Sequence, residues 1–385
     1  MSDCKRIIIA YYINPSLGSD FRVGYEYVNF ASINGFDCAI TSDLNENISD
    51  IKPDYFYKKL KLIKIKSIVK NHQTLMKVND FVPQLIWHFN VYRWINKNCK
   101  NVDIIWISCS SAQLWFPLKL YLKICKKLIW GPIGGGGIPS SEILQKFSLK
   151  TLIRERLRAI IDGICFQIKV DVLTRNRGTI FLMVRTAEMK KRIEKFIPGY
   201  SAEFFPEFIN LIRPKKFTRR LISEPKFIWV GQDIPRKDLG LGIEIFRRLK
   251  EGYFKNSTLD IYGVEGESLA DEGIKYLGWI KGGIDWAQYT NSGVLILSSY
   301  REGLSTVLIE ALSNGLFAIA TPVGAIPLFK FENIYVLSPE DHVSLDDNTI
   351  FKIAKEINLH LSKIKWEVSG IDYSPKLSKF IKKIL

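Results

Sequence analysis

Short apolar runs of strand length alternate with longer amphipathic stretches along most of the chain. This alternation is typical of βα units, in which parallel strands form a sheet and helices cover its faces. The first half predicts strands at residues 6–13, 37–41, 103–108, 127–130 and 171–174, and helices at 25–34, 80–98 and 151–169. Residues 59–66 fit neither the strand period nor the helix period.

The same alternation restarts after a basic segment with two prolines at residues 212–225. The second half predicts strands at 226–230, 257–262, 275–278, 294–298 and 317–320, and helices at 238–250, 285–290 and 305–313. One sheet for the whole chain would need a larger core than a single domain usually builds. We therefore predict an α/β protein with two doubly wound domains facing a central cleft, because such sheets bind ligands at the carboxyl ends of their strands.

The composition is that of a globular protein with an unusual charge. The chain has 385 residues, of which 47% are hydrophobic, so it can bury substantial cores and is neither disordered nor collagen-like. Its 55 Lys and Arg against 39 Asp and Glu give a formal net charge of +16. The 6 cysteines show no C-x-x-C spacing, which favours a reduced compartment over a disulfide framework or a zinc site.

The sequence predicts no transmembrane segment. Residues 6–13 are apolar, but Asn14 and Pro15 follow without a small-residue cleavage site, so we interpret this run as a strand rather than a signal peptide. Residues 308–329 are the longest weakly charged stretch, and they contain Glu310 and two prolines, a poor composition for a membrane span.

The most informative window runs from the strand at 294–298 through a glycine-containing loop into a helix. Ser305 or Thr306 can cap this helix, which leaves backbone N–H groups at the carboxyl edge of the sheet available to a phosphate. Glu302 in the loop and Glu310 in the helix can accept hydrogen bonds from sugar hydroxyls. Together these features suggest a sugar nucleotide, although a strand-loop-helix unit by itself is more often plain scaffolding.

A family resemblance rests on the two glutamates. Glu302 and Glu310 are separated by seven residues, and this spacing resembles the E-x7-E signature of the retaining GT-B glycosyltransferases of family four, the glycosyl transferases group 1. Upstream, residues 227–239 are similar to the family's strand, glycine and diphosphate-binding loop. Residues 259–263 and 274–278 resemble its next two strands with their trailing glycines. The resemblance covers nearly the whole second half in the right order.

The first half resembles the family more weakly. Residues 14–24, with Gly18, resemble its first glycine loop, and residues 129–137, with Gly135 and Gly136, resemble the Gly-Pro-x-Gly-Gly-Gly loop of one branch. Glycine lets a backbone approach a ligand closely, but a glycine run alone is more typical of a flexible connection. Many relatives use a histidine from the N-terminal domain, and none lies in this second loop.

The resemblance implies a domain organisation of the GT-B type, with Rossmann-like domains. Residues 1–205 would form the acceptor-binding domain, 206–225 a linker and 226–365 the nucleotide-sugar-binding domain. Residues 366–385 would form a C-terminal helix that packs back on the first domain.

The resemblance also implies a hexosyltransferase that retains the anomeric configuration, with a nucleotide sugar as substrate and neither a cofactor nor a metal ion. Lys237 and Arg236 would stabilise the leaving diphosphate, and Glu302 would position the donor sugar. The donor site would further include Glu310 on the ribose and the backbone at Gly18, Gly231, Gly303, Leu304, Ser305 and Thr306. Gln232 stands where the family usually has an arginine, and Arg236 can supply that charge. The alternative is that Arg236 and Lys237 are a solvated surface pair, as two adjacent basic residues usually are.

The first half contains a few further candidate residues. Arg175 directly follows the predicted strand at 171–174 and would meet phosphate or acceptor there, while a solvated surface arginine is the simpler alternative. Gly135 and Gly136 share this weakly supported acceptor side. His88 is interpreted as an ordinary helix histidine packed among aromatic residues.

The positive charge favours an anionic partner. Basic and large apolar residues interleave at 57–70, 118–127 and 151–158, a pattern that suits an anionic membrane surface or simply solvates amphipathic elements. We expect a cytoplasmic protein, peripheral on the inner membrane, that glycosylates a saccharide or polyprenyl-linked acceptor in bacterial O-antigen, capsule or lipopolysaccharide biosynthesis. A basic nucleic-acid-binding protein and a GT-B sugar-nucleotide epimerase or phosphorylase are the alternatives, although no nucleic-acid-binding motif is present.

Overall fold

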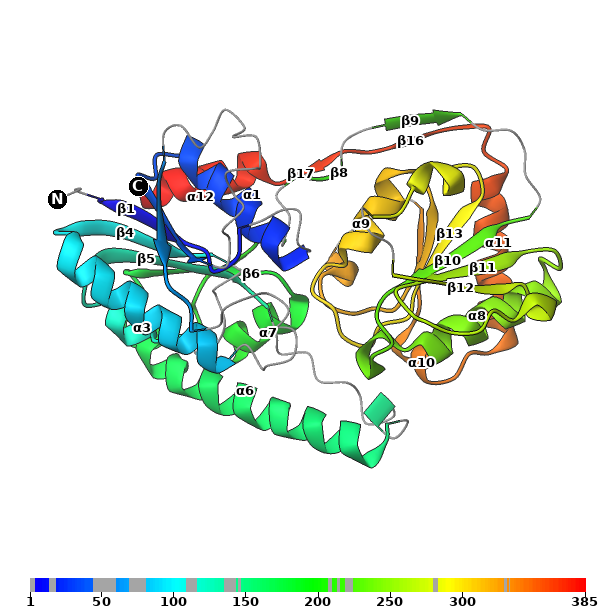
Figure 1. The fold of residues 1–385 in the computed structure, drawn as a ribbon, viewed down its shortest axis with the longest axis horizontal. Coiled ribbons are helices and arrows are strands. Elements are labelled where there is room, and N and C mark those ends of the chain that lie inside the picture. The colour runs from blue at the N-terminus through cyan, green and yellow to red at the C-terminus, as the bar shows by residue number, and fades with distance from the viewer. Residues whose placement is uncertain are drawn as a thin grey trace. The chain divides into compact units, whose positions relative to one another are not determined.

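The chain folds into two compact units (Figure 1). The computed structural model describes residues 4–13, 19–43, 60–68, 81–108, 116–134, 143–144, 147–206, 210–212, 215–218, 224–279, 283–328, 331 and 333–385. The first unit comprises Met1–Gly136, Arg158–Ile209 and Tyr373–Leu385, and the second comprises Gly137–Leu157 and Asn210–Asp372.

The first unit is a parallel sheet covered by helices. Its strands are β1 (Arg6–Ile9), β2 (Cys38–Ser42), β3 (Lys61–Ile65), β4 (Val102–Ile107), β5 (Cys125–Ile133), β6 (Ile180–Val184) and β7 (Ala202–Phe204), in the order β3-β2-β1-β4-β5-β6-β7. Its helices are α1 (Ser19–Ile33), α3 (Phe81–Asn98), α4 (Leu118–Tyr121), α6 (Leu149–Arg175, which begins in the second unit), α7 (Ala187–Phe196) and α12 (Ser374–Ile384). Every pairing in this sheet is parallel.

The second unit repeats this architecture. Its strands are β10 (Lys226–Val230), β11 (Thr258–Tyr262), β12 (Ile274–Gly278), β13 (Gly293–Leu297), β14 (Phe317–Ala320) and β15 (Ile334–Val336), in the order β12-β11-β10-β13-β14-β15. Its helices are α8 (Leu239–Gly252), α9 (Thr306–Ser313), α10 (Pro339–Val343) and α11 (Asp347–Leu361), with 3-10 turns η3 (Pro235–Lys237), η4 (Ala270–Glu272), η5 (Trp286–Tyr289) and η6 (Ile326–Leu328).

The strand order of the second sheet reverses between β10 and β13. From β10 the chain moves outward to β11 and β12, then returns to place β13 on the other side of β10. All of these pairings are parallel, so the loops that follow β10 and β13 leave the sheet side by side at its carboxyl edge. In doubly wound sheets, ligands bind outside the carboxyl ends of the strands at such a reversal.

The segments around the predicted linker form strands. Strand β8 (Asn210–Ile212) pairs with β17 (Ile371–Asp372), and β9 (Lys215–Thr218) pairs with β16 (Lys365–Val368), both antiparallel. The tail, predicted as one helix over 366–385, therefore begins as strand. Helix α12 begins only at Ser374 and belongs to the first unit. Residues 137–157, placed in the first domain by the sequence, belong to the second unit.

Most predicted elements are present, but α1 begins at Ser19, well before the helix predicted at 25–34, and the helix predicted at 285–290 is the 3-10 turn η5. The strand predicted at 171–174 is the last turn of α6, and the next strand is β6. Val172 and Leu173 of this turn lie in the same buried core as Phe166, so core packing favours the helix here. The ambiguous segment at 59–66 contains β3, the edge strand of the first sheet.

Candidate active site

The candidate site lies on the loops after β10 and β13, at the reversal of the second sheet. The first loop turns at Gly231, whose amide donates to the carbonyl of Tyr262 over 3.0 Å. Gly263, with a φ of +84°, packs so closely that a Cβ there would lie 2.4 Å from the Gly231 carbonyl oxygen. These two glycines allow the ends of β10 and β11 to approach one another.

The turn η3 fixes two basic residues at the start of α8. Asp238, with a φ of 47°, is the N-cap of α8, and its side chain accepts from the amide of Leu241 over 3.2 Å. Ser298, directly after β13, places its hydroxyl 3.0 Å from the Lys237 carbonyl and 2.7 Å from the Asp238 carbonyl. Trp229 donates to the same hydroxyl over 3.0 Å. The backbone of Lys237 is thus anchored to both strands.

Glu302 holds both basic residues through one carboxylate oxygen. Its Oε1 accepts from Arg236 Nη1 over 3.2 Å, from Lys237 Nζ and from Ser299 Oγ over 3.0 Å. The side chains of Glu302 and Lys237 are only 11% and 15% exposed, and that of Arg236 is 33% exposed. Two cations and one carboxylate leave one net positive charge at a partly buried point, where an anionic group is strongly favoured.

The backbone that follows Glu302 packs closely against a turn at Gly324. The Gly303 carbonyl accepts from the amide of Ala325 over 2.9 Å. A Cβ on Gly324, where φ is +62°, would lie 2.1 Å from the Gly303 oxygen and 2.3 Å from the Glu302 oxygen. Gly324 is therefore a requirement of the loop geometry that the sequence analysis did not identify.

Helix α9 begins where the sequence predicts. Ser305 is its N-cap, and the hydroxyl accepts from the amide of Leu308 over 3.4 Å. Leu304 and Ser305 are buried, whereas Thr306 is the first helical residue and is half-buried. The first turn of α9 therefore directs backbone N–H groups towards the same sheet edge as the Glu302 loop.

Glu310, in the second turn of α9, has an aromatic partner that sequence reasoning missed. The indole Nε1 of Trp286, from η5, donates to its Oε2 over 3.3 Å. Both side chains are half-buried. The carboxylate of Glu310 is therefore oriented by an indole, and no local spacing in the sequence links the two residues.

A second missed partner is Glu155. Arg301 Nη1 donates to Glu155 Oε2 over 2.9 Å, and the Glu155 side chain is only 2% exposed. Next to it, the rings of Phe147 and Tyr300 pack with centroids 4.6 Å apart. These contacts lie within the second unit and tie the loop that carries Glu302 to the N-terminal part of α6.

Arg175 and Gln232, which the structure describes, make none of the contacts given above. Arg175 ends α6 instead of following a strand, is 76% exposed and pairs with Asp171 over 2.8 Å, so the interpretation as a solvated arginine is correct. Gln232 is exposed on the β10 loop. Gly18, Gly135 and Gly136 lie outside the described residues.

His88 is an ordinary core histidine of the first unit, as predicted. It is 1% exposed, and its Nδ1 lies 2.9 Å from the hydroxyl of Tyr121. The ring also packs against those of Trp87 and Phe116.

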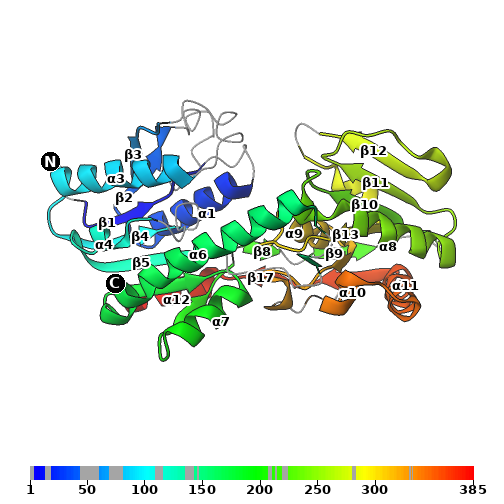
Figure 2. The same ribbon diagram turned by 90° about the horizontal axis from the view of Figure 1, so that it is seen from below.

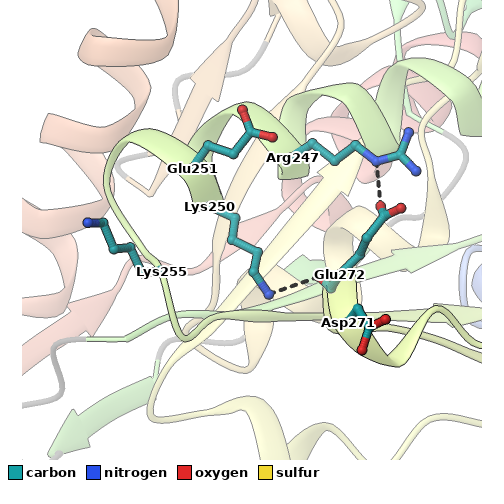
Figure 3. Close-up of a pocket in the computed structure, with 6 residues that line it drawn as sticks. All are labelled: Arg247, Lys250, Glu251, Lys255, Asp271 and Glu272. Carbon is teal, nitrogen blue, oxygen red and sulfur yellow. Dashed lines mark hydrogen bonds and ion pairs between the residues drawn. The ribbon is translucent and has the colours of Figure 1, made fainter.

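A surface hollow lies elsewhere on the second unit (Figure 3). It is lined by Arg247, Lys250, Glu251, Lys255, Asp271 and Glu272. Arg247 Nε donates to Glu272 Oε2 over 2.6 Å, which raises the pKa of the guanidinium, and Lys250 Nζ donates to the Glu272 carbonyl over 2.9 Å. Arg247 stands about 12 Å along α8 from its first residue, at 1.5 Å per residue, so the hollow is at the other end of this helix from Lys237.

The described residues contain no cluster of three or more His, Cys, Asp or Glu side chains arranged to hold a metal ion. Among the helices that the structure describes, none combines the length and the apolar character needed to cross a bilayer.

Residues 224–350 match the model of the family described as glycosyl transferases group 1. This region is a group 1 glycosyltransferase domain. The match includes β10, the Arg236–Lys237 turn, the Glu302 loop and Glu310. The chain is therefore a transferase enzyme, as the sequence predicts. No curated protein matches this sequence.

Solved structures share the fold of the entire glycosyltransferase. Sucrose-phosphate synthase from Thermosynechococcus elongatus is 13% identical, with a TM-score of 0.59 over 98% of each chain. The lipopolysaccharide outer core galactosyltransferase WaaB is 14% identical, with a TM-score of 0.54 over 99% of this chain and 100% of that chain. WaaG, a glycosyltransferase involved in lipopolysaccharide biosynthesis, is 15% identical, with a TM-score of 0.51 over 97% of this chain and 99% of that chain. The predicted GT-B fold with two Rossmann-like domains is confirmed.

Proposed function

We propose that this glycosyltransferase transfers a sugar from a nucleotide-sugar donor, with retention of anomeric configuration, to a saccharide or lipid-linked saccharide acceptor. The proposed role is in bacterial surface polysaccharide biosynthesis, as O-antigen, capsule or lipopolysaccharide, at the cytoplasmic face of the membrane. The observation that carries the proposal is the cluster of Arg236, Lys237 and Glu302 at the reversal of the second sheet.

The cluster suits the departure of a nucleoside diphosphate. When the bond between the anomeric carbon and the phosphate oxygen breaks, negative charge collects on the diphosphate. Lys237 and Arg236, held in place by Glu302, then donate to the phosphate oxygens without having to reorganise. The first turn of α9 adds its backbone N–H groups to the same anion. In this scheme these groups stabilise the leaving diphosphate without a metal ion. Activity is therefore expected to persist in the presence of a chelator.

Retention follows if the acceptor approaches on the face that the diphosphate leaves. The acceptor oxygen forms the new bond to the anomeric carbon, and its proton passes to the departing phosphate oxygen. Glu302 is not required as a nucleophile in this scheme, because the acceptor oxygen attacks the anomeric carbon directly, and its Oε1 instead accepts from three donors. Its role is to hold the two cations and to orient the donor sugar. Glu310, oriented by Trp286, accepts from the ribose hydroxyls.

A thermal-shift screen tests the donor site. The melting temperature is measured with UDP-, GDP-, ADP- and CMP-sugars, and one class is expected to raise it. The rise is expected to vanish in Glu310→Ala and to weaken in Lys237→Ala. Glu272→Ala and Arg247→Ala, which change the distant charged hollow, are the matched controls. Equal stabilisation of all four variants would place the donor elsewhere.

Product stereochemistry tests the proposed mechanism. Once a donor is known, the anomeric coupling constant of the product is compared with that of the donor by proton NMR. Retention supports the front-face scheme, and an inverted product refutes it. The same assay with and without a chelator tests the proposal that no metal ion takes part.

A further inference from the structure

Helix α6 carries an exposed apolar face along most of its length. It is one unbroken helix of 27 residues (Figure 2). Seven of its large aliphatic side chains, here named the α6 apolar stripe, are each at least 50% exposed: Leu149, Ile153, Leu157, Ile160, Ile161, Ile164 and Ile168. They recur every three or four residues, so they share one side of the helix.

Two charged side chains of α6 are buried while the stripe of aliphatic side chains is exposed, which is unusual for a surface helix. Glu155 and Lys169 are buried, the first paired with Arg301 and the second donating to the Phe116 carbonyl over 2.7 Å. Surface helices normally bury their aliphatic residues and expose their charges. A contiguous apolar patch of this size on a folded chain marks a surface that meets an apolar partner.

Basic residues border the stripe. By helical geometry Arg156 lies along one edge, Arg154 lies along the other, and Lys150 is in the first turn. The acidic residues of α6 do not offset them. Glu155 is on the buried face, and Asp162 and Asp171 are paired with Arg192 and Arg175. The N-terminal half of the exposed face is therefore apolar in its centre and positive at its edges.

We propose that the α6 apolar stripe docks this enzyme on the surface of an anionic lipid bilayer. The inference rests on the peripheral membrane contact in the proposed function and assigns it to one helix face. An interfacial helix buries its apolar side chains at the boundary of headgroups and acyl chains while basic side chains reach the anionic headgroups. The stripe from Leu149 to Ile168 extends about 29 Å at 1.5 Å per residue, long enough for the helix to lie flat on a bilayer.

The structure favours α6 over the other two basic, apolar stretches of the sequence. In the stretch at 118–127, Leu118 and Tyr121 are buried in the core. In the described part of the stretch at 57–70, Ile63 and Ile65 pack against the same core. Apolar side chains that already fill a core are not available to lipid.

Charge favours a membrane over a second copy of the chain. Two copies that met along the stripe would bring arginines together from both helices, and like charges repel. The chain as a whole carries a formal net charge of +16, which opposes self-association and attracts it to anionic lipid.

Co-sedimentation with sucrose-loaded vesicles tests the inference. The full chain is mixed with phosphatidylcholine vesicles, with and without 30 mol% phosphatidylglycerol, at low and high salt. Binding is expected on the anionic vesicles and is expected to weaken with salt. The triple variant Ile160→Ser, Ile164→Ser, Ile168→Ser is expected to bind at least tenfold less. Arg154→Gln with Arg156→Gln is expected to lose about fivefold per charge.

The matched controls lie on α11, whose Phe351, Leu359, Lys352 and Lys355 are also exposed. Phe351→Ser with Leu359→Ser, and Lys352→Gln with Lys355→Gln, are expected to bind vesicles as the natural chain does. The melting temperature of each variant without ligand shows whether it is folded, and this control does not depend on the transferase proposal. The inference is overturned if the natural chain ignores anionic vesicles or if the triple variant binds them unchanged. It is also overturned if light scattering shows that the triple substitution only dissociates an oligomer.

Discussion

Arg301 and Glu155 form an ion pair, 2.9 Å from Nη1 to Oε2, between the loop that carries Glu302 and helix α6. The Glu155 side chain is only 2% exposed, so its carboxylate is shielded from water where it meets Arg301. The pair is flanked by the packed rings of Phe147 and Tyr300. The position of Glu302 therefore depends on a helix that lies far away in the sequence.

Replacing Glu155 by alanine is expected to lower the free energy of unfolding by about 1.5–3 kcal/mol, because it removes a charge-assisted hydrogen bond whose carboxylate is buried. Activity is expected to fall as well, because the Glu302 loop loses this anchor. Asp171→Ala, which removes an exposed carboxylate from the same helix, is the control and is expected to change stability by less than about 0.5 kcal/mol. Denaturant unfolding and initial rates measure both effects. A Glu155 variant as stable as the Asp171 variant would contradict the anchoring role.

Lys237 and Arg236 are expected to differ in their effect on turnover. The side chain of Lys237 is 15% exposed and that of Arg236 is 33% exposed, so Lys237 acts in the less hydrated environment. Removing one preorganised donor to a developing anion typically costs a factor of about 100–1,000 in rate. The loss of rate in Lys237→Ala is expected to lie in that range, and the loss in Arg236→Ala is expected to be smaller.

Steady-state kinetics on both variants, with Arg247→Ala as the control, checks this order. The loss is expected mainly in kcat, because the charge that these residues stabilise appears as the sugar–phosphate bond breaks. A larger loss of kcat in Arg236→Ala would assign the main stabilising role to Arg236. A change confined to KM would mean that neither residue acts mainly on the charge that develops as the bond breaks.

Gly324→Ala is expected to disturb the Glu302 loop without touching a charged group. The new Cβ would lie 2.1 Å from the Gly303 carbonyl oxygen, and the φ of +62° is unfavourable for alanine. We expect a loss of about 1–3 kcal/mol in stability together with reduced activity. Gly163→Ala is the matched control, since nothing lies within 4 Å of a Cβ there and the residue is inside α6. Alanine at Gly163 is expected to stabilise the chain by about 0.5–1 kcal/mol.

The sequence predicts the sheet of the second unit well because each of its central strands is a compact apolar run. Residues 226–230 and 317–320 are predicted at the bounds that β10 and β14 have in the structure. Arg236, Lys237 and Glu302 are predicted through the family resemblance, and in the structure all three lie together on the loops after β10 and β13. Their convergence on one oxygen of Glu302 depends on side-chain conformations and could not be read from spacing.

What the sequence misses are contacts between distant segments. Arg301 and Glu155 are 146 positions apart, and neither residue carries a local sign of its partner. The pairs β8 with β17 and β9 with β16 join the predicted linker to the tail, where basic residues and prolines suggest a loop. The strand predicted at 171–174 is a converse error, because these residues continue helix α6 and its buried face, which includes Phe166.

Lys169 gives the first unit a pH dependence whose sign can be stated. Burial lowers the pKa of its ammonium from the ordinary 10.5 to about 8. Between these two values the unfolded chain binds more protons than the folded chain, so the contribution of Lys169 to stability rises with pH across this window. Below pH 8 both states hold the proton, and the charged form costs the fold roughly 3 kcal/mol. The donation to the Phe116 carbonyl persists in either protonation state, because a neutral amine still has N–H groups.

Lys169→Met removes this titration and isolates it from other groups that ionise in the same range. The free energy of unfolding is measured for both chains by denaturant titration at pH 7, 8, 9 and 10. Relative to the variant, the natural chain is expected to gain roughly 2–3 kcal/mol as pH rises through this series. Because the lost hydrogen bond to Phe116 contributes the same difference at each pH, it shifts the two curves without changing their divergence. Parallel curves would mean that the amine of Lys169 reaches water in the folded chain.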